Sequence, residues 1–122
     1  MKNTLQILLF ISLMSTYSMA QADQKNLQVP FKYALGKNLF EKNCSSCHGV
    51  LGGGTDKGPT FMHAFYKPNH HGDASFYRAA LQGVKTHHWN YGDMPRVEGI
   101  TKRTLGKIVP YIRWVQRQNG IQ

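Results

Sequence analysis

A chain of 122 residues, 41% hydrophobic and 17% charged, has the length and composition of one small domain, which excludes a two-domain architecture. Its formal net charge of +9 favours encounters with acidic partners. Nucleic acid is disfavoured as the partner, because the sequence lacks a basic stretch with interleaved aromatic residues and begins like an exported chain.

The first 20 residues have the features of a secretory signal peptide. Lys2 supplies a positive start, residues 5–13 form an apolar run, and Ala20 ends a group of small residues suited to cleavage, with Ala22 as the alternative end. The apolar run is too short to span a bilayer comfortably, which disfavours a retained membrane anchor. We therefore expect a soluble mature protein in the periplasm.

This reading divides the chain into a signal peptide, a loose polar segment and one folded domain, at residues 1–20, 21–29 and 30–122. Lys2 is one of the 15 basic residues, so its removal with the signal lowers the net charge from +9 to +8. The mature surface would still be basic, and its encounters with partners would be sensitive to salt.

The folded part is predicted to begin with a helix that runs to about Asn43. Pro30 suits the first helical position. Gly36 lies inside the helix and costs about 1 kcal/mol relative to alanine, a cost often tolerated where another backbone comes close. The residues at helical spacing are Phe31, Ala34, Leu35, Leu39 and Phe40.

The end of this helix carries the most specific motif of the chain, Cys44-Ser45-Ser46-Cys47-His48. Cys-x-x-Cys-His is the pattern of covalent attachment for a c-type haem. Two thiols at this spacing form thioethers with two vinyl groups of one porphyrin, and the adjacent histidine supplies the proximal iron ligand. The motif therefore predicts one haem c, bound through Cys44, Cys47 and His48. A covalently held macrocycle would also add to the hydrophobic core of a small domain that has no cysteine left for a disulfide.

Three other readings of the same cysteines are weaker. A thioredoxin-like redox pair needs a strand before the motif and a βαβ pattern around it, and neither is visible. A zinc site that combines the cysteines with His63 and His70 has looser histidine spacing than a zinc finger and lacks a second cysteine pair. A disulfide between Cys44 and Cys47 would close a very short loop and constrain little.

The middle of the chain is predicted to be mostly irregular. Residues 49–58 contain five glycines and form a loop that Gly58 and Pro59 close, without the strand or the Gly-Lys-Ser/Thr ending of a phosphate-binding loop. A short helical turn is expected around residues 61–66. A helix over residues 74–84 should follow, with Asp73 as its N-cap.

Residues 85–99 are expected to be irregular, and a final helix follows with Thr101 as its cap and Gly120 just past its end. Pro110 lies inside this helix and should either kink it or move its start nearer Lys107. No strand pattern of any length appears, so the predicted fold class is all-α, with three to five helices.

A haem with one histidine ligand needs a second axial ligand or an open face. Met94 is favoured, because it lies in an irregular segment between two helices and Pro95 stiffens its backbone. A thioether ligand raises the reduction potential of a haem relative to one with two histidine ligands. The competing candidates are His63, His70, His71, His87 and His88.

These residues together resemble a class I cytochrome c. The landmarks occur in the family's order over residues 31–119: a helix with Gly36 and Phe40, the haem motif, Gly58-Pro59, Met94-Pro95 and a closing helix. The resemblance implies a small all-α fold around one haem, with His48 and Met94 on the iron. It also implies that the Pro59 carbonyl accepts a hydrogen bond from His48, and that Gly36 and Phe40 meet Ile108 and Tyr111 where the first and last helices cross.

Two features depart from the family pattern. Pro110 is unusual in the closing helix, and the five histidines outside the motif are many for so small a chain. The segment from His87 to Tyr91 is expected to line the haem edge, with Trp89 or Tyr91 donating to a propionate.

One-electron transfer is the predicted function, since an iron with ligands on both faces has no site for substrate. The expected partners are proteins with acidic docking surfaces, which would meet a basic rim formed by Lys57, Lys67, Lys85 and Arg96. Two alternatives remain: a haem enzyme or gas-binding module, which needs Met94 to leave the iron, and copper handling by the histidines and methionines.

Overall fold

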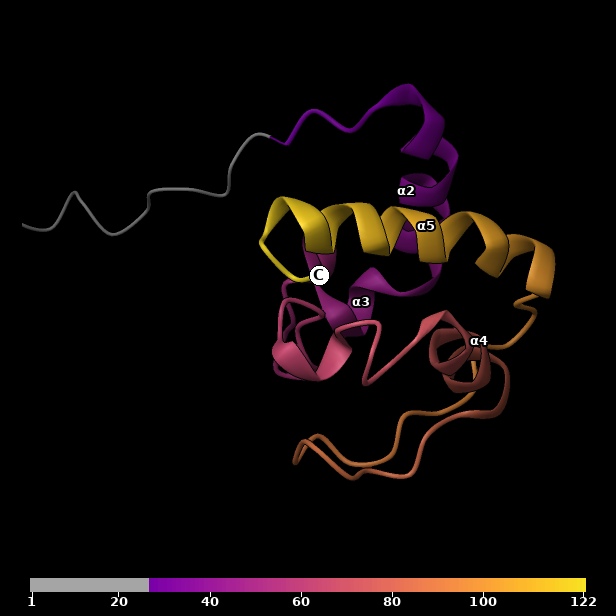
Figure 1. Ribbon diagram of the computed structural model, residues 1–122. Helices are drawn as coiled ribbons and strands as arrows, with labels where there is room; N and C mark the ends of the chain where they lie inside the picture. The colour runs from indigo at the N-terminus through magenta and orange to yellow at the C-terminus, as the bar shows by residue number, and fades with distance from the viewer. Residues whose placement is uncertain (1–26) are drawn as a thin grey trace, which may run out of the picture.

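The computed structural model describes residues 27–122, and the predicted signal peptide lies outside them. The described residues form helices joined by long loops, with no strand among them, which confirms the all-α fold class (Figure 1). The helices are α2 (Phe31–Asn43), α3 (Ser45–His48), α4 (Asp73–Gln82) and α5 (Lys102–Gln118), and the short 3₁₀ turns are η2 (Val50–Gly52) and η3 (Ala64–Tyr66).

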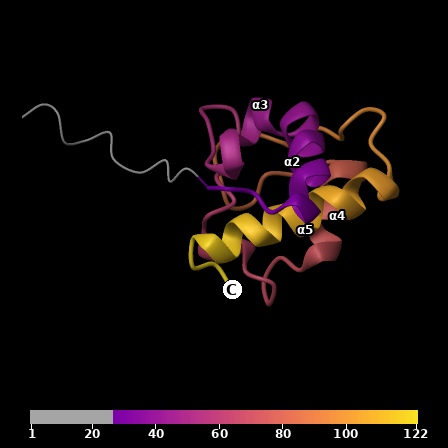
Figure 2. The same ribbon diagram turned by 90° about the horizontal axis from the view of Figure 1, so that it is seen from above.

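The fold is organised around the crossing of α2 and α5, which is visible in both views (Figures 1 and 2). At the crossing a Cβ atom on Gly36 would lie 2.2 Å from the Lys107 carbonyl oxygen and 2.9 Å from Tyr111 Cβ. Phe40 is completely buried and packs against Tyr111, with the two ring centroids 5.6 Å apart. The expected close approach of the first and last helices at Gly36 is therefore present.

The buried face of α2 is not the one that the apolar spacing predicted. Phe31 is 96% exposed and Leu35 is 55% exposed. At 3.6 residues per turn these two side chains lie about 140° and 100° around the helix from Gly36. The crossing with α5 buries the glycine face, where Tyr33 also stacks on Trp114, so two large apolar residues remain in solvent.

The capping of the helices differs from the prediction by one residue at two places. Pro30 is the N-cap of α2 rather than its first helical residue. Gly72 is the N-cap of α4, which begins at Asp73 and ends at Gln82. The Asp73 carboxylate does not cap the helix, because it pairs instead with Arg113 of α5 at 2.7 Å.

Helix α5 begins where its capping residue predicts and not nearer Lys107. The Thr101 side chain accepts a hydrogen bond from the Thr104 N–H at 3.1 Å. The helix then continues from Lys102 through Pro110 to Gln118. Most residues of α5 from Leu105 to Gln116 are buried, so this helix forms the central wall of the domain.

The chain between α4 and α5 forms a long loop at the bottom of Figure 1. Val84 and Met94 exchange two backbone hydrogen bonds of 2.9 Å and so close its base. None of the helices within residues 27–122 has the length and apolar character needed to cross a membrane.

A methyl group at Gly36 tests the crossing. We expect Gly36→Ala to destabilise the haem-loaded protein by about 2–3 kcal/mol, because the new Cβ overlaps a backbone carbonyl that cannot move without separating the helices. Urea unfolding followed by far-ultraviolet circular dichroism measures the change.

Gly106→Ala is the matched control, since it also lies inside a helix and its Cβ would meet only the Tyr77 hydroxyl, at 3.5 Å. Alanine there should stabilise the helix by about 0.5–1 kcal/mol. Equal effects of the two substitutions would show that the crossing does not depend on glycine.

Candidate functional site

The Cys-x-x-Cys-His motif follows the last turn of α2 and forms the short helix α3. The Cys44 carbonyl accepts hydrogen bonds from the N–H groups of Cys47 at 3.2 Å and His48 at 3.0 Å, so the motif is a single helical turn. Cys44 is half-buried, Cys47 is exposed, and His48 is 8% exposed. Both thiols are free, and a single turn presents them and the imidazole from one short segment.

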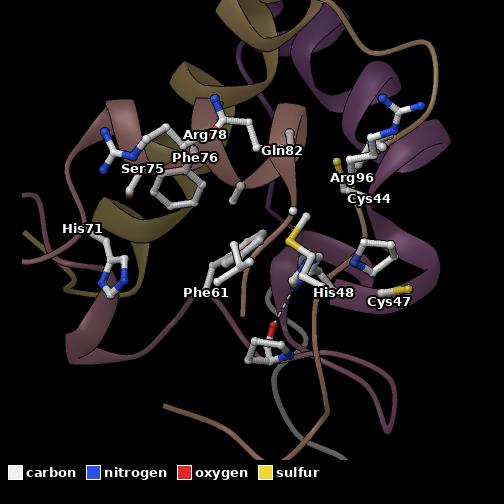
Figure 3. Close-up of a pocket in the computed structure, with 18 of the residues that line it drawn as sticks. Cys44, Cys47, His48, Phe61, His71, Ser75, Phe76, Arg78, Gln82 and Arg96 are labelled. Carbon is white, nitrogen blue, oxygen red and sulfur yellow. Dashed lines mark hydrogen bonds between the residues drawn. The ribbon is translucent and has the colours of Figure 1, made fainter. Parts of the chain in front are cut away.

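The glycine-rich loop folds back over the motif and fixes the imidazole. His48 Nδ1 lies 3.0 Å from the Pro59 carbonyl oxygen, to which it donates (Figure 3). A Cβ on Gly58 would lie 2.9 Å from the Cys47 carbonyl oxygen, so only glycine allows this approach. The Thr55 hydroxyl also donates to that carbonyl, at 2.5 Å. The hydrogen bond leaves the lone pair of the other ring nitrogen of His48 available to a metal.

The ionisation of the motif suits a neutral imidazole and not a redox thiol pair. Burial holds the pKa of His48 below its usual value, an effect that the Pro59 hydrogen bond partly offsets. Burial, together with the neighbouring Cys47, raises the pKa of the Cys44 thiol to about 11. Thioredoxin-like cysteines instead have lowered pKa values, so the redox-pair reading loses support.

A cavity of about 690 Å³ opens beside the motif. This volume lies within the range of about 300–1,000 Å³ that is typical of cofactor pockets. Its walls are mostly apolar and come from residues 59–66, α4, α5 and the loop between these two helices; the apolar residues include Phe61, Phe76, Ala80, Val84, Val97, Leu105, Ile108, Val109 and Ile112. The cavity is therefore suited to a large, flat, mostly apolar group.

The cavity brings together all five residues that sequence reasoning singled out. Cys44, Cys47, His48, Pro59 and Met94 all line it, although Met94 lies 46 positions after His48 in the chain. Met94 is half-buried, and its backbone is the one held by Val84 at the base of the loop. Gly83, with φ of +80°, lets the end of α4 approach it: a Cβ there would lie 2.7 Å from the Met94 carbonyl oxygen.

The five histidines outside the motif gather near the far side of this cavity. His71, His87 and His88 line it, whereas His63 and His70 do not. Figure 3 shows His71 and Cys47 on opposite sides of Phe61. Within the described residues, the side chains that cluster closely enough to share a metal ion are His70, His71 and His88, without either cysteine. The zinc site of Cys44, Cys47, His63 and His70 is therefore not assembled.

One buried polar atom tests whether the cavity fits a haem. Two buried side-chain polar atoms among residues 27–122 lack a hydrogen-bond partner, the Trp89 indole nitrogen and the Tyr111 hydroxyl, and only Trp89 lines the cavity. Burial raises the pKa of the Tyr66 hydroxyl, and the neighbouring Trp89 indole acts in the opposite direction. An acceptor that reached this indole N–H would satisfy it, and haem carries two carboxylates.

Arg113 supports the wall of the site, and the sequence did not predict this role. It is 8% exposed on α5. It donates to the Asp73 carboxylate at 2.7 Å, to the Tyr66 carbonyl at 2.7 Å, to the His71 carbonyl at 2.6 Å and to Gln116 at 2.8 Å. One guanidinium group thus ties the segment after η3 and the start of α4 to the central helix. Nothing in the spacing of Arg113 distinguished it from a surface arginine.

The family model described as Cytochrome c matches residues 33–116 of the 122, and the chain belongs to this family. No curated protein and no solved structure matches the chain. Family membership establishes haem-based electron transfer as the general function, and it agrees with the helical fold and with the haem motif on α3.

Removing the Arg113 charge tests the role of this support. We expect Arg113→Met to lower the free energy of unfolding by about 2–4 kcal/mol, because two part-buried carbonyl groups and a carboxylate lose their donor. Because the Asp73 carboxylate is exposed, the loss of free energy should be smaller than for a fully buried ion pair. Urea unfolding of the haem-loaded protein measures it.

Arg117→Met is the control on the same helix. Arg117 reaches only the Tyr33 hydroxyl, at 3.4 Å and in an exposed position. This change should cost less than about 0.5 kcal/mol. If both variants were equally stable, the Arg113 network would not support the site.

Proposed function

We propose that the chain is an exported, soluble, monohaem cytochrome c that carries single electrons through an iron ligated by His48 and Met94. In this proposal Cys44 and Cys47 hold haem c through two thioethers. The bound haem supplies the one-electron chemistry, by cycling between the ferric and ferrous states. The residues of the chain attach the group, orient it, exclude water and set its potential.

Each residue of the motif has a role that its surroundings support. His48 is neutral, nearly buried and oriented by the Pro59 carbonyl, as a metal-bound imidazole usually is. The thiols lie at the entrance of an apolar cavity of suitable volume. The observation that carries the proposal is that this cavity joins the motif to Met94 across the fold.

The fixed backbone of Met94 favours it over the histidines as the distal ligand. Two hydrogen bonds to Val84 hold Met94, and the chain returns to α4 directly afterwards through the hydrogen bond from the Val97 N–H to the Ala80 carbonyl, at 2.8 Å. His87 and His88 lie farther out in the loop, and His71 donates its Nδ1–H to the Phe65 carbonyl on the far side of the cavity. We therefore favour the Met94 thioether, on its fixed backbone, as the ligand for the open face of the iron.

With ligands on both faces the iron would leave no site for oxygen or substrate. This arrangement supports an electron carrier over a haem enzyme or gas-binding module. The family's general function points in the same direction.

The basic rim proposed for docking is smaller than the sequence suggested. Lys85 pairs with Asp93 at 2.5 Å and Arg96 pairs with Glu98 at 2.8 Å, so two of its four charges have acidic neighbours. Lys57 is exposed and Lys67 is half-exposed. We propose that acidic redox partners are attracted by the overall positive charge of the chain more than by one dense patch.

The test of the iron ligands is the reactivity of the periplasmically matured protein. It should contain one covalently attached haem, be low-spin in both oxidation states and bind carbon monoxide poorly when reduced. Met94→Ala should become partly high-spin and bind carbon monoxide rapidly, because it opens the distal face. Met94→His should stay low-spin and lower the reduction potential by on the order of 100 mV, since axial ligands tune haem potentials over about 0.8 V.

His87→Ala serves as the control for Met94→Ala. It removes a cavity-lining histidine from the same loop and should leave the spin state and the potential unchanged. Rapid carbon monoxide binding by the unmodified protein, or a Met94→Ala variant that stays low-spin, would reject Met94 as the ligand and favour the enzyme or gas-binding alternative.

The unpaired indole of Trp89 gives a second prediction. If it donates to a haem propionate, Trp89→Phe should lower the stability of the haem-loaded protein by about 1 kcal/mol and lower its reduction potential, because the propionate charge loses a neutralising donor. Potentiometry and urea unfolding measure the two effects. Tyr91→Phe, at a neighbouring side chain that is 45% exposed, should change neither. Unchanged values for Trp89→Phe would remove the propionate role.

A further inference from the structure

The histidines near the far side of the cavity form a cluster that the haem proposal does not use. His70 and His71 follow η3, and His88 comes from the loop between α4 and α5. One ring nitrogen from each of the three lies within 4.8 Å of the other two. The Nε2 atoms of His70 and His88 are 3.3 Å apart and share a hydrogen bond, which a bound ion would replace. Segments 17 positions apart in the chain, His71 and His88, thus present imidazole nitrogens to one point.

We propose that His70, His71 and His88 bind one divalent transition-metal ion, with Zn²⁺ as the ion that fits best, at a site separate from the haem iron. Two nitrogens bound to a tetrahedral zinc ion at about 2.0–2.1 Å are separated by about 3.3–3.4 Å. The spacing between His70 and His88 already has this value. The His71 ring nitrogen of the cluster lies within 4.8 Å of the other two. A movement of at most about 1.5 Å would therefore complete three ligands, and water would take the fourth position.

The surroundings of His71 prepare it as a ligand. Its Nδ1–H donates to the Phe65 carbonyl, which leaves the lone pair on Nε2. Metal-bound histidines usually donate their second ring N–H to a backbone carbonyl in this way. Arg113 holds the His71 carbonyl at 2.6 Å, so the backbone that carries the ligand is tied to the core.

The other two ligands are held by an aromatic side chain. The Phe65 ring stacks on His88, with centroids 4.2 Å apart and planes 21° apart. It also lies 5.9 Å from the His70 ring. Desolvation and the nearby histidines keep the pKa of His88 below its usual value, which favours the neutral form that a metal needs.

The remaining two histidines are unsuited to the same ion. His63 Nδ1 accepts a hydrogen bond from the Phe65 N–H at 3.2 Å, so its lone pair is already used. His87 donates from Nδ1 to the Lys85 carbonyl at 2.8 Å and its ring nitrogens lie outside the cluster. His63 therefore provides a natural control, because its ring contacts the same Phe65 ring as His70 and His88 without being a predicted ligand.

The site has a structural consequence. An ion bound there would connect the segment after η3 to the loop that carries Met94, because His88 lies between Val84 and Met94. Since only the folded arrangement assembles the three ligands, binding should stabilise the native state by mass action. The proposal does not depend on which residue is the distal iron ligand, except that His70, His71 and His88 must all be free of the iron.

The experiment is a Zn²⁺ titration of the mature, haem-loaded, reduced protein, with a chromophoric chelator as competitor. Zn²⁺ is the probe because Cu²⁺ could oxidise the haem. We expect one ion per chain and a higher thermal unfolding temperature with Zn²⁺. Each of His70→Gln, His71→Gln and His88→Gln should weaken binding at least about 100-fold, since even outer residues of metal sites cost 10–100-fold. His63→Gln should bind as tightly as the unmodified protein.

Nitrogen NMR of the histidine rings in the reduced, low-spin protein provides a second readout, with shifts expected for His70, His71 and His88 only. Equal affinity in all four variants, or loss in His63→Gln as large as in His88→Gln, would overturn the site. The haem spectrum and the slow carbon monoxide reaction should stay unchanged in His63→Gln and His70→Gln, whose side chains do not line the cavity. If His88→Gln made the reduced haem reactive, His88 would be an iron ligand, and both the zinc site and the His48/Met94 assignment would fall. If Met94→Ala stayed low-spin but bound Zn²⁺ normally, only the His48/Met94 assignment would be rejected, and the zinc site would stand.

Discussion

The contact between the Gly36 backbone and the Lys107 carbonyl is the constraint on which the site depends. Because Gly36 has no side chain, α2 can lie directly against α5, and Phe40 and Tyr111 fill the angle between them. The haem motif begins immediately after α2, so the position of this helix sets the position of both thiols and of His48. Helix α5 also forms a wall of the cavity, which means that the same crossing places the haem motif beside the cavity.

A second set of contacts brings the opposite side of the cavity to the motif. Gly83 ends α4 in a conformation that L side chains rarely adopt and allows Met94 to dock on it. The Val84 bridge then fixes the backbone of Met94, while the intervening residues, with His87 and His88, extend away as a loop. The two proposed iron ligands thus come from distant segments, each held by its own hydrogen bonds: the His48 ring by the Pro59 carbonyl and the Met94 backbone by Val84.

The region around Arg113 connects these two sides of the fold. Its guanidinium group binds carbonyls before and after the short segment that carries His70 and His71, and it also holds the start of α4. A charged group buried in this way stabilises a fold only when its donors are largely satisfied, and here four of the five N–H groups have acceptors at 2.6–2.8 Å. The histidine cluster is therefore part of an ordered wall, and the proposed metal site would use an arrangement that the core already maintains.

The sequence by itself determined the features that depend on neighbours along the chain. The haem motif, the end of α2, the Thr101 cap, the glycine-rich loop and the need for a close approach at Gly36 all follow from local spacing and backbone preference, and family landmarks added Pro59 and Met94 as candidates. Only the tertiary structure decided which face of α2 is buried, leaving Phe31 in solvent, and that Asp73 pairs with Arg113 instead of capping α4. It also decided that His70, His71 and His88 meet. These outcomes depend on contacts between segments that are far apart in the chain. Such contacts produce no hydrophobic periodicity in either segment, so the sequence pattern does not predict them.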